Sequence, residues 1–303
     1  MQTHDFLPDS IAQLTAEESV SLVQAMQRCS IATPLCPRPI ETAFVQQSGG
    51  GIPILLLHGF DSSLLEFRYL LPLLQHQSTW LLDLLGFGFT ARPATVACTP
   101  DYIKTHLYHF WHTQIRQPMI LVGASMGGAV AIDFTLSHPE IVAKLVLIDS
   151  VGYTGPPPYV KFLFPPLDYW AVEYLRQRKL KALEFSTSTN ADPDLLDLLR
   201  CSVIHTEMPG WHDSMVSFTK SGGYSFLGEN ACMSHGHRIG HITNPTLILW
   251  GEADDVLGTD DAKKFHRDIA GSQLIWIRDS KHVPHIEQPQ VTAKHILDFS
   301  LQN

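Results

Sequence analysis

Residues 119–138 read MILVGASMGGAVAIDFTLSH, and this stretch decides the fold class. The apolar run Met119–Val122 predicts a buried strand, and the pattern of Met126–Ser137 predicts a helix. Between them stands Ser125, with Gly123 two residues before it and Gly127 two residues after it. Small residues are needed at these positions because a sharp turn brings strand and helix close together and strains the serine backbone. The pattern therefore predicts a strand–turn–helix unit with a hydroxyl at its apex.

Three further strand patterns end in residues that carry chemistry. Residues 52–60, IPILLLHGF, are a buried-strand run that ends in His-Gly-Phe. Residues 246–255, TLILWGEADD, are a strand run followed by acids, and residues 274–289, LIWIRDSKHVPHIEQP, are a strand run followed by histidines. The chain order is thus serine, acid, histidine, each placed just after a strand.

In this order the four motifs resemble the α/β-hydrolase superfamily, from about Thr42 to the end of the chain with a divergent middle. The resemblance implies an α/β fold: a mostly parallel sheet of about eight strands flanked by helices, with a helical cap insertion. We expect residues 1–40 to form an N-terminal helical extension. Residues 41–152 and 242–303 would form the core, and residues 153–241 the cap.

The order of elements follows from periodicity and capping signals. Thr15–Glu18 reads as a capping box that opens a helix to about Cys29, and Thr99-Pro100 opens another. The expected strands cover residues 42–46, 52–57, 80–84, 119–122, 144–148, 246–249 and 273–277. Further helices are expected at residues 64–74, 126–137, 260–269 and 290–300, and in the cap at 159–164, 169–183, 195–204 and 211–218.

A serine hydroxyl is a poor nucleophile at neutral pH, so it needs a base within hydrogen-bond reach and an acid that orients the base. The superfamily shows Gly-His-x-x-x-x-Glu-x-Pro after its last strand. His282 fits this register as the base, Glu287 and Pro289 match the tail, and Lys281 replaces the glycine. His285 is the alternative base.

By the same resemblance, the acid follows the penultimate strand in a Gly-x-x-Asp pattern. Asp254 matches that pattern, with Asp255 as the second candidate. Asp149 is the third, because some members place the acid after the preceding strand. Asp133 lies in the helix behind the nucleophile and reads as a solvated or capping carboxylate.

The resemblance also implies two donors for an oxyanion, the backbone N–H groups of Phe60 and Met126. His58 would have a structural part in its turn. The loop 83–90, DLLGFGFT, would shape the neighbourhood of the site without taking part in catalysis.

Composition limits the classes of partner. The 303 residues are 45% hydrophobic and 17% charged, and the net charge of −9 argues against nucleic acid or an anionic membrane surface as a general partner. Five cysteines without C-x-x-C spacing, no signal-peptide pattern and no membrane-spanning run predict a cytoplasmic protein. We expect no cofactor and no metal, because the two histidine groups lack a metal-site spacing: His106, His109 and His112, and His235, His237 and His241.

The sequence therefore predicts a serine hydrolase in which Ser125, His282 and Asp254 cleave an ester or thioester of a small hydrophobic substrate. Carbon–carbon bond hydrolases, acyltransferases and perhydrolases share this triad, and a slow-turnover, receptor-like binding protein is the rival from another class. The serine argues against dehalogenases and epoxide hydrolases, which use an aspartate there. Aromatic residues of the cap could line the pocket: Phe162, Phe164, Trp170, Trp211 and Phe218. Residues 58–63, 218–224 and 248–252 look like a little-characterised cyanobacterial and chloroplast branch, and the oligomeric state stays open.

Overall fold

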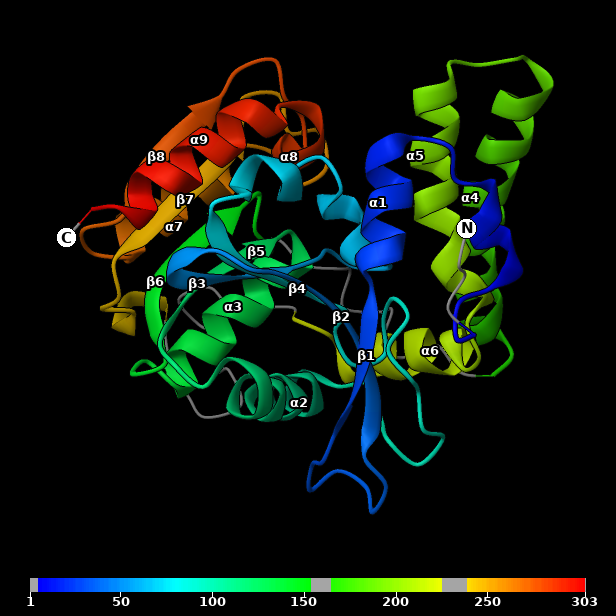
Figure 1. Cartoon of the computed structure of the whole chain (residues 1–303), viewed down its shortest axis with the longest axis horizontal. Helices are drawn as coiled ribbons and strands as arrows, with labels where there is room; N and C mark the ends of the chain where they lie inside the picture. The colour runs from blue at the N-terminus through cyan, green and yellow to red at the C-terminus, as the bar shows by residue number, and fades with distance from the viewer. Residues whose placement is uncertain (1–4, 154–164, 225–238, 303) are drawn as a thin grey trace.

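The computed structural model describes residues 5–153, 165–224 and 239–302 (Figure 1). Its centre is an eight-stranded sheet with the order β1-β2-β4-β3-β5-β6-β7-β8. Strands β3 to β8 run parallel, whereas β1 and β2 pair antiparallel at one edge. The expected fold class, a mostly parallel sheet of about eight strands, is confirmed. The strands are β1 (Gln27–Ile31), β2 (Ile40–Gln47), β3 (Gly50–Leu57), β4 (Gln77–Leu82), β5 (Met119–Ala124), β6 (Val142–Ile148), β7 (Thr246–Gly251) and β8 (Gln273–Ile277).

Helices cover both faces of this sheet, and the strand residues alternate between two apolar cores. Leu55 and Leu57 face the core under α2, α3 and α7, whereas Ile54 and Leu56 face the core under α1 and α9. Helices α4 and α5 pack on each other beside the sheet, with α6 close to them (Figure 1). The helices are α1 (Glu17–Ala25), α2 (Pro100–Phe110), α3 (Met126–Ser137), α4 (Leu167–Ser188), α5 (Pro193–Ile204), α6 (Trp211–Ser221), α7 (Asp260–Asp268), α8 (Pro284–Glu287) and α9 (Pro289–Ser300).

The N-terminal prediction was wrong in two ways. Helix α1 ends at Ala25, and the chain continues as β1, because the edge of β2 offers unpaired backbone groups to residues 27–31. No capping box forms at Thr15. Instead the backbone amides of Thr15 and Ala16 donate to Oδ1 of Asp197 in α5, at 2.7 and 3.1 Å. A carboxylate from another helix therefore fixes the two residues that precede α1, and residues 1–40 are not purely helical.

The structure also tests the helix expected at residues 64–74 and the helix start expected at Thr99. The single helix expected at residues 64–74 is two short 3₁₀ helices, Leu64–Phe67 and Leu71–Leu74, because Pro72 interrupts the helical pattern. Thr99 does cap α2, with Oγ1 accepting from the amide of Tyr102 at 3.4 Å. The cap helix expected at 159–164 lies outside the described residues. None of the described helices combines the length and apolar character needed to cross a bilayer.

Candidate active site

Ser125 lies at the turn between β5 and α3, where its backbone is held at φ 50° and ψ −116°. A Cβ on Gly123 would lie 2.2 Å from the carbonyl oxygen of Gly127, and one on Gly127 would lie 2.2 Å from that of Leu57. Both positions exclude any side chain, so the strained conformation of the serine is fixed by its neighbours. The predicted strand–turn–helix unit is therefore present.

The structure brings the three predicted catalytic side chains into one row. Oγ of Ser125 lies 3.0 Å from Nε2 of His282, and Nδ1 of His282 lies 3.1 Å from Oδ2 of Asp254. An ionised carboxylate only accepts, so Nδ1 carries the proton and Nε2 is free to accept from the serine hydroxyl. The Asp254 side chain is fully buried, whereas that of His282 is 15% exposed.

Backbone donors hold Asp254 in place. Its Oδ1 accepts from the amides of Val256 at 2.8 Å and Leu257 at 3.0 Å. Burial alone would raise the pKa of Asp254, but the hydrogen bonds from His282 and these two amides lower it overall. The carboxylate is thus ionised at neutral pH and can stabilise a positive imidazolium.

The rejected alternatives lie elsewhere. Asp255 is exposed and forms an ion pair with Nζ of Lys281 at 2.9 Å. His285 is buried, 3.4 Å from Oε1 of Glu66 and against the ring of Phe67. Neither side chain joins the row that contains Ser125.

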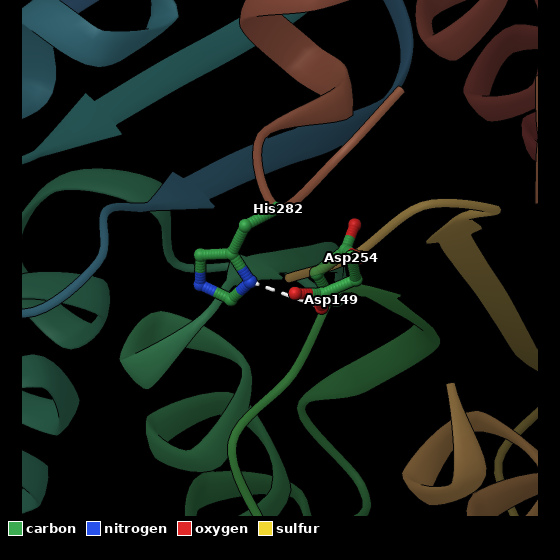
Figure 2. A group of neighbouring side chains, drawn as sticks. All are labelled: Asp149, Asp254 and His282. Carbon is green, nitrogen blue, oxygen red and sulfur yellow. Dashed lines mark hydrogen bonds and ion pairs between the residues drawn. The ribbon is translucent and has the colours of Figure 1, made fainter. Parts of the chain in front are cut away.

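Asp149, the third candidate acid, lies next to the row at the end of β6. Its Oδ1 accepts from the amide of Gly251 at 3.0 Å, and its side chain is fully buried. Figure 2 shows its carboxyl group beside the carboxylate of Asp254 and the imidazole of His282, with one ligand atom of each residue within 4.8 Å of the others. Burial, reinforced by the hydrogen bond and charge of Asp254, raises the pKa of Asp149 to about 10. Two neighbouring carboxyl groups thus differ in protonation: that of Asp149 is neutral and that of Asp254 is ionised.

The same three groups are spaced closely enough to hold a metal ion. Both ring nitrogens of His282 are already used in the row, however, so a metal there would compete with Ser125 or Asp254. Of the histidines singled out in the sequence, His106 is buried and bonded to Oγ1 of Thr42 at 2.8 Å, and burial lowers its pKa to about 3. His235 and His237 lie outside the described residues.

The predicted oxyanion donors lie beside Ser125. The amide of Met126 begins α3, where the helix dipole favours negative charge. A Cβ on Gly59 would lie 3.4 Å from Cβ of Ser125, so the turn that contains Phe60 passes next to the hydroxyl. The amide of Gly59 itself donates to Oε1 of Glu66 at 3.0 Å, which anchors this turn.

His58 and the 83–90 loop have structural roles next to the site. His58 donates from Nδ1 to the carbonyl of Gly59 at 2.8 Å and accepts at Nε2 from the amide of Leu84 at 3.1 Å. It thereby joins the turn to the 83–90 loop. Burial lowers the pKa of His58 to about 4, so it is neutral at physiological pH. In the loop, Asp83 accepts from the amides of Leu64 and Phe89 at 2.6 and 2.7 Å.

Comparison with known proteins agrees with this geometry. The model described as "Alpha/beta hydrolase family" matches residues 54–295. The chain belongs to this family. The Alpha/beta hydrolase domain-containing protein VTE7 of Arabidopsis thaliana is 37% identical over 252 residues, which cover 82% of this chain and 74% of that protein.

More distant relatives of this hydrolase differ in their named activities. The 2-hydroxy-6-oxo-2,4-heptadienoate hydrolase of Pseudomonas putida is 26% identical, with 83% of this chain and 90% of that protein covered. A thermophilic esterase from Thermogutta terrifontis has the same fold, with a TM-score of 0.71 and 24% identity over 90% of this chain and 97% of that one. The relatives thus include a lipase and a 2-hydroxy-6-oxo-2,4-heptadienoate hydrolase, and an esterase shares the fold.

An apolar cavity of about 310 Å³ lies where helices α4 and α6 approach Phe60 and Met126 of the hydrolase. Phe60 and Met126 reach it from the core, and its other walls include Val172, Leu175, Val216 and Phe218 from α4 and α6. Of the aromatic residues expected there, Phe218 lines the cavity, whereas Trp170 is 62% exposed on the outside of α4, so that expectation was wrong for Trp170. Trp211 is buried against the core, and Phe162 and Phe164 lie outside the described residues.

A second cavity of about 380 Å³ contains Ser125 and His282 themselves. Its walls include the charged side chains of Asp61, Glu66 and Arg68. The serine hydroxyl therefore faces a cavity of mixed lining with charged groups in its wall, and Phe60 lines both this cavity and the apolar one.

Asp61, in the wall of the Ser125 cavity, contacts the segment between α4 and α6, a contact that the sequence did not reveal. Its carboxylate accepts from Nζ of Lys179 at 2.6 Å, Nε2 of His205 at 3.0 Å and Nε1 of Trp211 at 3.0 Å. Burial would raise the pKa of Asp61, but His205 and Lys179 outweigh it and hold that pKa at about 2. An acid that follows His-Gly-Phe was the only signal in the sequence for this link.

The expectation for Asp133 was wrong. It is buried in α3 and forms an ion pair with Nζ of Lys104 in α2 at 3.0 Å. The pairing satisfies a buried charge and joins the two helices on one face of the sheet.

Proposed function

We propose that this hydrolase cleaves an ester or thioester of an apolar substrate through Ser125, His282 and Asp254. The observation that carries the proposal is the continuous row of contacts, 3.0 Å from Oγ to Nε2 and 3.1 Å from Nδ1 to Oδ2, beside an apolar cavity. The row has the geometry of an activated nucleophile, and the cavity is of the kind that accepts a hydrocarbon chain.

The reaction would proceed in two halves. Oγ of Ser125 attacks the carbonyl carbon while its proton moves to Nε2 of His282, and Asp254 stabilises the imidazolium. The oxygen of the tetrahedral intermediate accepts from the amides of Phe60 and Met126. His282 returns the proton to the leaving alcohol or thiol, and the acyl group stays on Ser125. Water then attacks the acyl-enzyme, again with His282 as the base, and releases the acid.

Carbon–carbon bond hydrolysis is the second candidate. The relatives that act on 2-hydroxy-6-oxo dienoates favour it, as does the buried Arg68 in the wall of the Ser125 cavity. The apolar lining of the neighbouring cavity favours an ester with a hydrocarbon chain. The identity to the Arabidopsis protein supports placement in a cyanobacterial and chloroplast branch and gives no substrate.

Labelling with a fluorescent fluorophosphonate tests the nucleophile. We expect wild type to react and Ser125→Ala and His282→Ala not to react, while His285→Ala, the matched control, retains labelling if it folds. A second pair compares Asp254→Asn with Asp255→Asn, where only the first should slow the reaction by about 10⁴. A folded wild-type protein that resists the probe and hydrolyses none of a series of chromogenic esters would favour the slow-turnover binding protein instead.

A further inference from the structure

One face of helix α4 is exposed along its whole length. It consists of residues spaced three or four apart, which places them in a single row on the helix surface. We call this row the α4 stripe, and its members are Leu167, Trp170, Tyr174, Arg178, Lys181 and Phe185. All six are exposed, and the aromatic side chains of Trp170, Tyr174 and Phe185 retain 62, 64 and 69% of their accessible surface. Four large apolar side chains in one exposed row need a reason, since burying them elsewhere would be favourable.

A neighbouring face of α4 lines the apolar cavity. Val172 and Leu175 line that cavity beside Phe60 and Met126, and α4 packs against α5 and α6 on this side. In Figure 1, α4 stands at the edge of the molecule, away from the sheet. An α-helix is about 10 Å across, so only the thickness of one helix separates the α4 stripe from the apolar cavity beside Phe60 and Met126.

The charges on α4 distinguish the stripe from the rest of the helix. Lys179 pairs with Asp61 and Arg176 with Glu173, so these two cations serve internal contacts. Arg178 and Lys181 have no ion-pair partner among the residues that the structure describes. They project from the middle of the stripe, between the aromatic side chains, in a chain whose net charge is −9.

We propose that the α4 stripe docks on a lipid bilayer with anionic headgroups, from which an apolar ester enters the cavity behind the helix. Tryptophan and tyrosine prefer the boundary between headgroups and hydrocarbon, and arginine and lysine there contact lipid phosphates. The overall negative charge opposes such docking only weakly, because charges more than about 8 Å from the surface are screened at physiological ionic strength. The substrate half of this proposal rests on the proposed function; the docking half does not.

Vesicle flotation with the full-length Ser125→Ala protein tests the docking without turnover. Vesicles would be phosphatidylcholine alone, or two parts phosphatidylcholine to one part phosphatidylglycerol. We expect the combined change Trp170→Ser, Tyr174→Ser and Phe185→Ser to lower partitioning into both by about tenfold or more. The control removes exposed apolar side chains elsewhere, Ile52→Ser, Val291→Ser and Leu301→Ser, and should change nothing.

The cations are tested separately. Arg178→Gln with Lys181→Gln should lower binding to the anionic vesicles by about fivefold per residue and leave binding to pure phosphatidylcholine nearly unchanged. Lys263→Gln with Lys294→Gln removes two exposed charges far from α4 and serves as the control. Equal binding by wild type and the stripe variants, or no binding of wild type to anionic vesicles, would overturn the proposal.

A second copy of the chain is the rival occupant of the stripe. Light scattering could show a dimer for wild type and a monomer for the variant with Trp170→Ser, Tyr174→Ser and Phe185→Ser. That result, without vesicle binding, would assign the stripe to self-association and refute docking. With Ser125 restored, the stripe variant should keep wild-type turnover of a short water-soluble ester and lose turnover of a vesicle-embedded one. Docking without turnover of any ester would instead reject the proposed function alone.

Discussion

Replacing Asp149 by asparagine tests the most unusual charge state of the site. Asp149 is fully buried beside Asp254 and His282, and burial with the neighbouring carboxylate raises its pKa to about 10. At neutral pH it is therefore protonated, and asparagine replaces one neutral group by another of the same shape. Asparagine also keeps an acceptor for the Gly251 amide and tolerates the positive φ of 40°. We expect the acid limb of the kcat/KM profile, where His282 becomes protonated, to stay within about 0.3 pH units of wild type.

An ionised Asp149 would give a different result. Unit charges 4.8 Å apart interact by about 3.5 kcal/mol at an effective dielectric constant near 20, which corresponds to about 2.5 pH units. A negative charge there would favour the imidazolium, so its removal would move the acid limb to lower pH by about 2 units. Such a shift, measured with a chromogenic ester, would refute the assignment of a neutral Asp149. Asp255→Asn, which removes an exposed charge one residue from Asp254, is the control.

Stability provides an independent measurement of the same charge state. The folded state keeps the Asp149 proton up to about pH 10, whereas the unfolded chain loses it near its ordinary value of 3.8. Stability is therefore lost as pH rises between these values, by at most about 4 kcal/mol at pH 7. Asp149→Asn removes this loss, so its melting temperature should exceed that of wild type near pH 8. The two should converge near pH 4.

Three further changes probe the turn, the link to the cap and the cavity. Gly127→Ala places a Cβ 2.2 Å from the carbonyl oxygen of Leu57 and should cost about 3 kcal/mol of unfolding free energy, measured by urea denaturation. Asp61→Asn weakens the contacts to α4 and α6 and should lower the free energy of unfolding by about 2 kcal/mol near neutral pH. Because the pKa of Asp61 is about 2, the stability that its carboxylate contributes is lost only as pH falls from about 4 to 2. Val216→Trp partly fills the apolar cavity and should lower kcat/KM about tenfold for long acyl chains but not for acetate esters.

Each of these has an outcome that contradicts its reasoning. An alanine at Gly127 with wild-type stability would mean that strand and helix can separate at no cost. Unchanged stability of Asp61→Asn would show that the three donors to Asp61 find equivalent partners. Equal loss for short and long esters in Val216→Trp would place the acyl chain outside the apolar cavity.

Much of the candidate site could be predicted because its residues are fixed either by a local turn or by their position at the end of a strand. The turn around Ser125 needs glycines at set spacings, which any reader of the sequence can find. The acid and base follow the ends of β7 and β8, and the carboxyl ends of parallel strands meet at one edge of a sheet. His282 and Asp254 thus reach Ser125 from separate parts of the chain, as their registers predicted.

The two mistaken predictions at the N-terminus share a cause. Residues 27–31 have no strong strand signal of their own, and they become β1 because β2 offers an open edge. The amides at the start of α1 are satisfied by Asp197, 182 positions away from Thr15 in the chain. No local pattern can show a partner that only folding brings near.

The sequence by itself determined the order of strands β2 to β8 and the identity of the residues that form the row at Ser125. Only the tertiary structure decided how the charges around that row are distributed. Asp149 is protonated and Asp254 ionised because one is buried beside a carboxylate and the other is held by two amides and an imidazole. The pairing of Asp61 with the cap and the exposure of the α4 stripe likewise depend on packing between distant segments. Burial and electrostatic partners are properties of three-dimensional neighbours, and a linear pattern does not contain them.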